Sequence, residues 1–152
     1  MDKITDIFNF LSIKSSLSTS GQPTEAQLSV LANQGYEVII NLALHNDPRY
    51  SLPDETGLVA SLGMTYIHIP VQFDAPTEND LKSFFNAMES NKNKKVHVHC
   101  AANMRVTAFL GLYYLIRQKK SKDEAFAPMN SIWEPDEVWS SFNSSMLAKY
   151  TS

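Results

Sequence analysis

The sequence predicts an α/β protein, a three-layer α/β/α sandwich with a mainly parallel central sheet. First, the runs "EVIINLAL", "MTYIHIPV" and "KKVHVHC" are short and bounded like strands, and they alternate with segments of helical pattern. Second, the run "EVIINLAL" is too apolar to have one face in water, which is typical of a parallel strand covered on both sides. Strand and helix alternation of this kind builds a parallel sheet with right-handed crossovers.

Capping patterns and turn residues predict where the helices begin and end. Three capping boxes precede helical segments, at Thr24 with Gln27, Thr77 with Asp80, and Ser121 with Glu124. Gly35 and Gly63 stand where the first two of the internal helices should end. Further helices are expected over residues 106–118 and, with Pro135 in its first turn, near the C-terminal end.

The N-terminal segment is predicted to be helical as well. Its apolar residues recur at helical spacing, at Ile4, Ile7, Phe8 and Leu11. The stretch "LSTSGQP" that follows is expected to form a short strand leading into a turn.

Composition limits the classes of protein and of partner. A chain of 152 residues, 43% of them hydrophobic, is long enough for a core, so we expect one domain over residues 1–152. A formal net charge of −3 gives no bulk attraction to nucleic acid or to an anionic membrane. No segment has the run of about 18 apolar residues that a membrane span needs. A single cysteine excludes an internal disulfide and favours a reducing, cytoplasmic location. The sequence does not indicate an oligomeric state.

The motif "VHCAANMR" carries the candidate chemistry. Cys100 stands at the carboxyl end of a predicted strand and just before a helix, where ligands of parallel sheets bind and where a thiolate is favoured. Arg105 offers a planar fork for two oxygens of a phosphate. The intervening residues, Ala101, Ala102, Asn103 and Met104, could turn their N–H groups onto an anion. These are the parts of a site for phosphoryl transfer to sulfur. The alternative is an ordinary buried thiol, with Arg105 paired to a surface acid.

Asp74 is the candidate general acid for such a reaction. It lies in "IPVQFDAPTENDL", after a buried strand whose carboxyl end meets the same edge of the sheet as Cys100. The alternative is a turn-forming aspartate before a helix. Asp80 reads as a helix cap. His45, Asp47 and Arg49 follow another strand and could contact substrate, although solvated loop residues are the simpler interpretation.

The histidines allow a metal site to be considered. His97 and His99 share one strand face, opposite the face that carries Cys100, and His68 could come from a neighbouring strand. No carboxylate or second cysteine falls at ligand spacing, so we expect no metal and no cofactor. Histidines of a covered strand are expected to bond to the backbone.

Three stretches, "SGQPTEAQL…GYEVIINL", "IPVQFDAPTENDL" and "VHVHCAANMR", resemble the β-lactamase hydrolase-like protein phosphatase-like domain family (domain of unknown function 442). This family belongs to the cysteine-phosphatase superfamily of dual-specificity type. The resemblance implies a phosphatase that acts on a phosphorylated substrate or another small oxyanion. It also implies roles: Cys100 as nucleophile, Arg105 as phosphate clamp, Asp74 as acid, His99 as the residue that orders the loop, and Thr107 as a hydroxyl near the sulfur.

The spacing departs from the usual signature of that superfamily. Five residues usually separate the cysteine from the arginine, whereas four separate Cys100 from Arg105, and none of them is glycine. Val106 takes the usual arginine position, while Thr107 fills the usual hydroxyl position. Rhodanese-type sulfurtransferases use four-residue loops, so sulfur transfer through a Cys100 persulfide is one alternative. A catalytically silent anion-binding module is the other.

Overall fold

The structure is a computed structural model that describes residues 3–46 and 51–151. Asp47 and Arg49 therefore lie outside the described residues. Five strands form one sheet in the order β1-β2-β5-β3-β4. Their bounds are β1 Leu11–Lys14, β2 Leu17–Ser20, β3 Val38–Asn41, β4 Thr65–His68 and β5 Val96–His99.

The strand directions confirm the predicted mainly parallel sheet. β5 pairs with β2 and with β3 in parallel, and β3 pairs with β4 in parallel. Only β1 runs antiparallel, beside β2. β5 is therefore the central strand, with two strands on each side.

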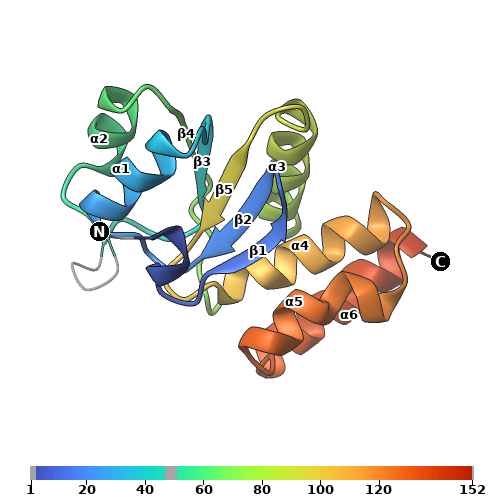
Figure 1. Cartoon of the computed structure of the whole chain (residues 1–152). Helices are drawn as coiled ribbons and strands as arrows, with labels where there is room; N and C mark the ends of the chain where they lie inside the picture. The colour runs from blue at the N-terminus through green and yellow to red at the C-terminus, as the bar shows by residue number, and fades with distance from the viewer. Residues whose placement is uncertain (1–2, 47–50, 152) are drawn as a thin grey trace.

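Helices cover both faces of this sheet, as predicted (Figure 1). One layer contains the short 3₁₀ helix η1 and two α-helices, and the other contains four α-helices. The bounds are η1 Ile4–Asp6, α1 Glu25–Asn33 and α2 Glu55–Ser61 for the first layer, and α3 Glu78–Ser90, α4 Met104–Ile116, α5 Lys122–Ile132 and α6 Glu137–Thr151 for the second.

β3 contributes side chains to two hydrophobic cores, one on each face of the sheet. Val38 and Ile40 join the core under α3 to α6, while Ile39 between them joins the core under α1 and α2. All three side chains are 0% exposed. Because both faces are covered, the strand has no polar face, which accounts for its continuous apolar run.

The capping boxes at Thr24 and Thr77 form as predicted, whereas Ser121 caps α5 only through the hydrogen bond that its hydroxyl accepts from the Glu124 N–H. Thr24 Oγ1 accepts from the Gln27 N–H at 3.1 Å, and Thr77 Oγ1 accepts from the Asp80 N–H at 3.1 Å. Gly35 and Gly63 have positive φ values, 90° and 83°, just after α1 and α2. In contrast, α4 begins two residues before its predicted start.

The predicted N-terminal helix is wrong. Only η1 is helical, and Leu11 instead begins β1. Asn9 has a φ of 52°, which interrupts any helix between them. A segment this short gains little from helical spacing alone, whereas pairing with β2 satisfies the backbone groups on that strand's outer edge.

None of the helices in the described part of the chain has the length and apolar character needed to cross a membrane.

Candidate active site

The connection from β5 to α4 lies at the carboxyl end of the central strand. β5 ends at His99 and α4 begins at Met104. The cysteine loop, defined here as residues 100–105, comprises the residues between these two elements and the first two residues of α4. Ligands of α/β sheets bind at this edge. The structure therefore places Cys100 at the position expected of a binding site.

A backbone N–H and a side-chain amide from neighbouring segments support the first half of the cysteine loop. The Gln22 N–H donates to the Ala101 carbonyl at 3.0 Å, and Asn9 Nδ2 donates to the Ala102 carbonyl at 3.1 Å. Gly21 packs so closely that a Cβ built on it would lie 2.5 Å from the Ala101 carbonyl oxygen. Any side chain at Gly21 would therefore push the loop out of place.

Asn103 makes the turn that leads into α4. Its φ of 66° and ψ of 11° are left-handed, a conformation that asparagine tolerates better than most residues. Its Nδ2 donates to the Asn9 carbonyl at 2.8 Å and to Thr19 Oγ1 at 3.0 Å. Asn103 thus supplies a left-handed turn in a loop that contains no glycine.

The loop presents backbone donors. No described residue accepts a hydrogen bond from the backbone N–H of Ala101, Ala102, Met104 or Arg105. The N-terminal end of α4 adds its partial positive charge at the same place. The loop is therefore electropositive, although the formal charge of the whole chain is negative.

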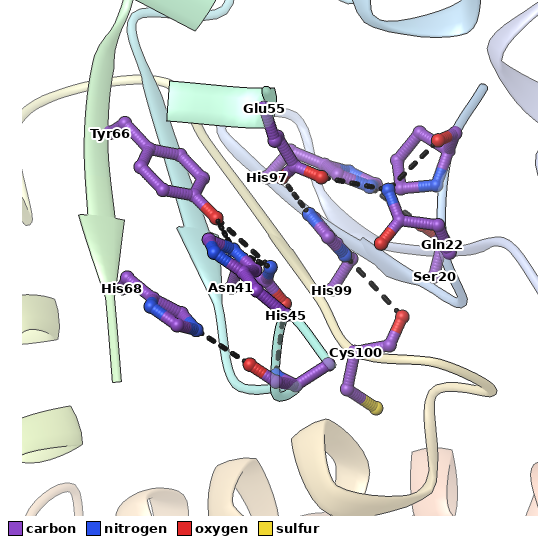
Figure 2. Close-up of polar contacts among 12 residues, drawn as sticks. Ser20, Gln22, Asn41, His45, Glu55, Tyr66, His68, His97, His99 and Cys100 are labelled. Atoms are coloured by element: carbon purple, nitrogen blue, oxygen red, sulfur yellow. Dashed lines mark hydrogen bonds and ion pairs between the residues drawn. The ribbon is translucent and has the colours of Figure 1, made fainter. Parts of the chain in front are cut away.

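Cys100 is 1% exposed, and its N–H donates to the Ser20 carbonyl at 3.3 Å. The residue belongs to the core on the α4 face of the sheet. Its sulfur points away from the ring of His99 (Figure 2).

Arg105 is a buried cation that has no acidic partner in the described part of the chain. The residue is 8% exposed, and Nη1 donates to the Val71 carbonyl at 2.7 Å. Its Nε is buried and has no hydrogen-bond partner. Among the described residues Arg105 forms no ion pair. Its guanidinium carbon lies 5.9 Å from the centre of the Phe73 ring.

Arg105 and Asp74 line one cavity. The cavity has a volume of about 390 Å³ and is lined by Ala43, Leu44, Asn46, Gln72, Phe73, Asp74, Ala101 and Arg105. Asp74 is exposed. The segment before it is anchored, because the indole N–H of Trp139 donates to the Phe73 carbonyl at 2.7 Å. The structure thus brings Asp74 and the cysteine loop to one opening.

Thr107 lies inside the first turns of α4. Its hydroxyl donates to the Asn103 carbonyl at 2.8 Å and accepts from the Trp133 indole N–H at 3.3 Å. These contacts join the cysteine loop to the segment between α5 and α6.

The three strand histidines differ in their partners. His68 bonds to the backbone as expected, with Nε2 2.6 Å from the Ala43 carbonyl oxygen. His97 instead lies between the hydroxyls of Ser18 and Ser20, at 2.6 Å and 2.7 Å. Burial, together with the charge of His99, sets the pKa of His97 well below its usual value. His97 is therefore a neutral side chain of the core.

His99 contacts a carboxylate that the sequence analysis missed. Its Nε2 lies 2.6 Å from Oε2 of Glu55, and Nδ1 lies 3.3 Å from the Cys100 carbonyl oxygen (Figure 2). Glu55 falls within a predicted helix, but no pattern links it to a strand 44 residues later. In the described part of the chain, no three His, Cys, Asp or Glu side chains are grouped so that they could hold a metal ion.

The architecture is that of the dual-specificity-type cysteine phosphatases. A family model described as "DSP-PTPase phosphatase fused to NAD+ Kinase" matches residues 10–140, and the chain belongs to this family. The match confirms the phosphatase-like family predicted from the sequence motifs.

Solved structures support the same assignment. A DUF442 protein of Shewanella putrefaciens CN-32, named as a presumed phosphatase, is 35% identical, with a TM-score of 0.85 over 97% of this chain and 96% of that one. Tk-PTP in its active form is 20% identical, with a TM-score of 0.73 over 93% of this chain and 95% of that chain. Kinase associated phosphatase, with its catalytic-site cysteine replaced by serine, is 12% identical, with a TM-score of 0.74 over 90% and 88%. The latter two establish the fold alone. A search of curated proteins found no match.

Proposed function

We propose that this protein is a cysteine-dependent phosphatase that hydrolyses a phosphomonoester. The buried guanidinium of Arg105, which forms no ion pair with any described residue and has an Nε without a hydrogen-bond partner, carries the proposal. A buried charge without a partner costs several kcal/mol. Such a cation is therefore expected where the protein binds an anion, and the free N–H groups of the cysteine loop lie beside it.

The reaction would proceed in two displacements at phosphorus. In the first, the Cys100 thiolate attacks, the sulfur–phosphorus bond forms, and the bond to the leaving oxygen breaks as Asp74 gives that oxygen its proton. In the second, the Asp74 carboxylate takes a proton from water, and the resulting hydroxide displaces Cys100 as phosphate is released. Arg105 and the loop N–H groups would bind the equatorial oxygens in both steps.

The four-residue spacing is compatible with this role. Asn103 closes the turn in a left-handed conformation, so α4 begins one residue before Arg105. Arg105 still reaches the cavity that Ala101 and Asp74 also line. The shorter loop therefore retains an arginine at the opening, which is the feature that phosphate binding requires.

Assays of the wild-type chain with a simple substrate test the proposal. We expect it to hydrolyse 4-nitrophenyl phosphate between pH 5 and 8, with inhibition by orthovanadate. Transfer of sulfur from thiosulfate to cyanide without phosphate hydrolysis would instead support the sulfurtransferase alternative. Tight phosphate or vanadate binding without turnover in either assay would support the silent anion-binding module.

Replacing Asp74 by asparagine should lower kcat by about 10²-fold, because the leaving oxygen would no longer receive a proton. The loss should be larger with phenyl phosphate than with 4-nitrophenyl phosphate, since the poorer leaving group depends more on protonation. Steady-state kinetics with both substrates measure this. Asp123→Asn, at an exposed position in the first turn of α5, is the matched control. Equal losses for the two substrates would argue against Asp74 as the acid.

A further inference from the structure

Glu55 is a buried carboxylate with a donor at each oxygen. The residue is 2% exposed and lies at the start of α2. Oε2 lies 2.6 Å from His99 Nε2, and Oε1 accepts from Gln22 Nε2 at 2.8 Å. The same nitrogen of Gln22 also donates to the Pro23 carbonyl at 2.9 Å, so two acceptors fix the orientation of its amide.

These contacts keep Glu55 ionised. Burial alone would raise its pKa, but the charge and hydrogen bond of His99, and the hydrogen bond of Gln22, outweigh it and lower the pKa of Glu55 below its usual value. A donor at each oxygen stabilises the negative charge and so favours the ionised carboxylate.

The ring of His99 has an acceptor at each nitrogen. Nε2 faces the Glu55 carboxylate, and Nδ1 faces the Cys100 carbonyl oxygen at 3.3 Å. A neutral imidazole has only one N–H, whereas an imidazolium can donate to both acceptors. His97 provides the contrast, since its two nitrogens face hydroxyls that can donate to it.

We propose that Glu55 is a positioning residue for Cys100, because it holds His99 as a cation directly behind the cysteine loop. This cation stabilises the Cys100 thiolate and, through the Cys100 carbonyl, orients the start of the loop. The inference rests on the proposed function only in taking the thiolate to be the nucleophile. The charge state of His99 is a separate question and can be measured by itself.

The other titratable groups around the pair come from three strands and their ends. His97 stands beside His99 on β5, with ring centres 6.5 Å apart. The others are His45, which follows β3, and Tyr66 and His68 on β4. Burial and then the Glu55 charge raise the pKa of Tyr66, so it stays a neutral phenol. Burial lowers the pKa of His68.

Nitrogen NMR of the histidine rings in the full chain tests the charge directly. In the wild-type protein at pH 7, His99 should show both ring nitrogens protonated, and His97 should show a neutral ring. In Glu55→Gln, whose amide oxygen can still accept from Nε2, His99 should become neutral. Glu134→Gln, at an exposed position, should leave both signals unchanged.

The reactivity of Cys100 gives a second measurement that needs no phosphatase activity. Because the chain has one cysteine, the rate of alkylation by iodoacetamide reports on Cys100 alone. The pH at which this rate reaches half its maximum should rise by about one unit in Glu55→Gln. Circular dichroism of each variant would establish that it is folded.

Two results would overturn the proposal. One is a neutral His99 ring in the wild-type protein, which decides the matter even if the Glu55→Gln variant does not fold. The other is a folded Glu55→Gln variant with the wild-type alkylation profile. If aryl phosphate is not hydrolysed but both measurements behave as expected, the proposed function fails while the role of Glu55 stands.

Discussion

Replacing Cys100 by serine should lower the hydrolysis of 4-nitrophenyl phosphate by a factor on the order of 10⁴ or more, because the residue would supply the attacking atom. A serine hydroxyl is not appreciably ionised at neutral pH, and no described base lies within hydrogen-bonding distance of that position. The change is close to isosteric, so the loop and the core around Cys100 should keep their structure. Steady-state kinetics on highly purified protein measure the loss.

Phosphate binding shows whether Cys100→Ser has lost only the reaction or has also lost the binding site. Cys100→Ser should still bind inorganic phosphate, since Arg105 and the loop N–H groups remain, and isothermal titration calorimetry can measure this. A variant that retains a tenth of the wild-type rate would show that Cys100 is not the nucleophile. If Cys100→Ser neither hydrolyses the substrate nor binds phosphate, the Arg105 variant becomes the more direct test of the site.

Replacing Arg105 by lysine should reduce kcat/KM for the same substrate by about 10³-fold. Lysine keeps the charge but lacks the planar fork that holds two oxygens at once. It would also lose the hydrogen bond from Nη1 to the Val71 carbonyl. Because these oxygens carry the developing charge, we expect the larger part of the effect in kcat.

The matched control for this variant is Arg117→Lys. Arg117 is exposed just beyond the end of α4, where its guanidinium lies 4.9 Å from the centre of the Phe85 ring. Its replacement should change kcat/KM less than twofold. Equal effects of the two variants would mean that Arg105 acts through the stability of α4 and does not bind the anion.

Much of the fold could be predicted from local signals. β3 has a continuous apolar run because both of its faces are covered. The caps at Thr24 and Thr77 mark helix starts through hydrogen bonds to the residue three positions later. The N-terminal segment could not be predicted in this way. Its conformation depends on pairing with β2 and on the left-handed turn at Asn9, neither of which the spacing of apolar residues encodes.

The candidate site likewise contains residues that local sequence patterns identify and residues that they do not. Cys100 and Arg105 could be found because their chemistry lies within six consecutive residues. Glu55 could not, because it meets His99 only after β5 and α2 have packed together. Asn9 is similar: it supports the cysteine loop from a distance of 93 residues in the chain.

The hydrogen bond from Trp139 to the Phe73 carbonyl has a consequence for how a substrate would bind. Trp139 is 0% exposed, so the residue just before Asp74 is attached to the core of the C-terminal helices. The segment therefore loses its conformational freedom when the protein folds, and a substrate need not order it on arrival. We expect this wall of the opening to keep its position when a substrate binds, so that a phosphomonoester is accommodated by the shape of its leaving group on this side.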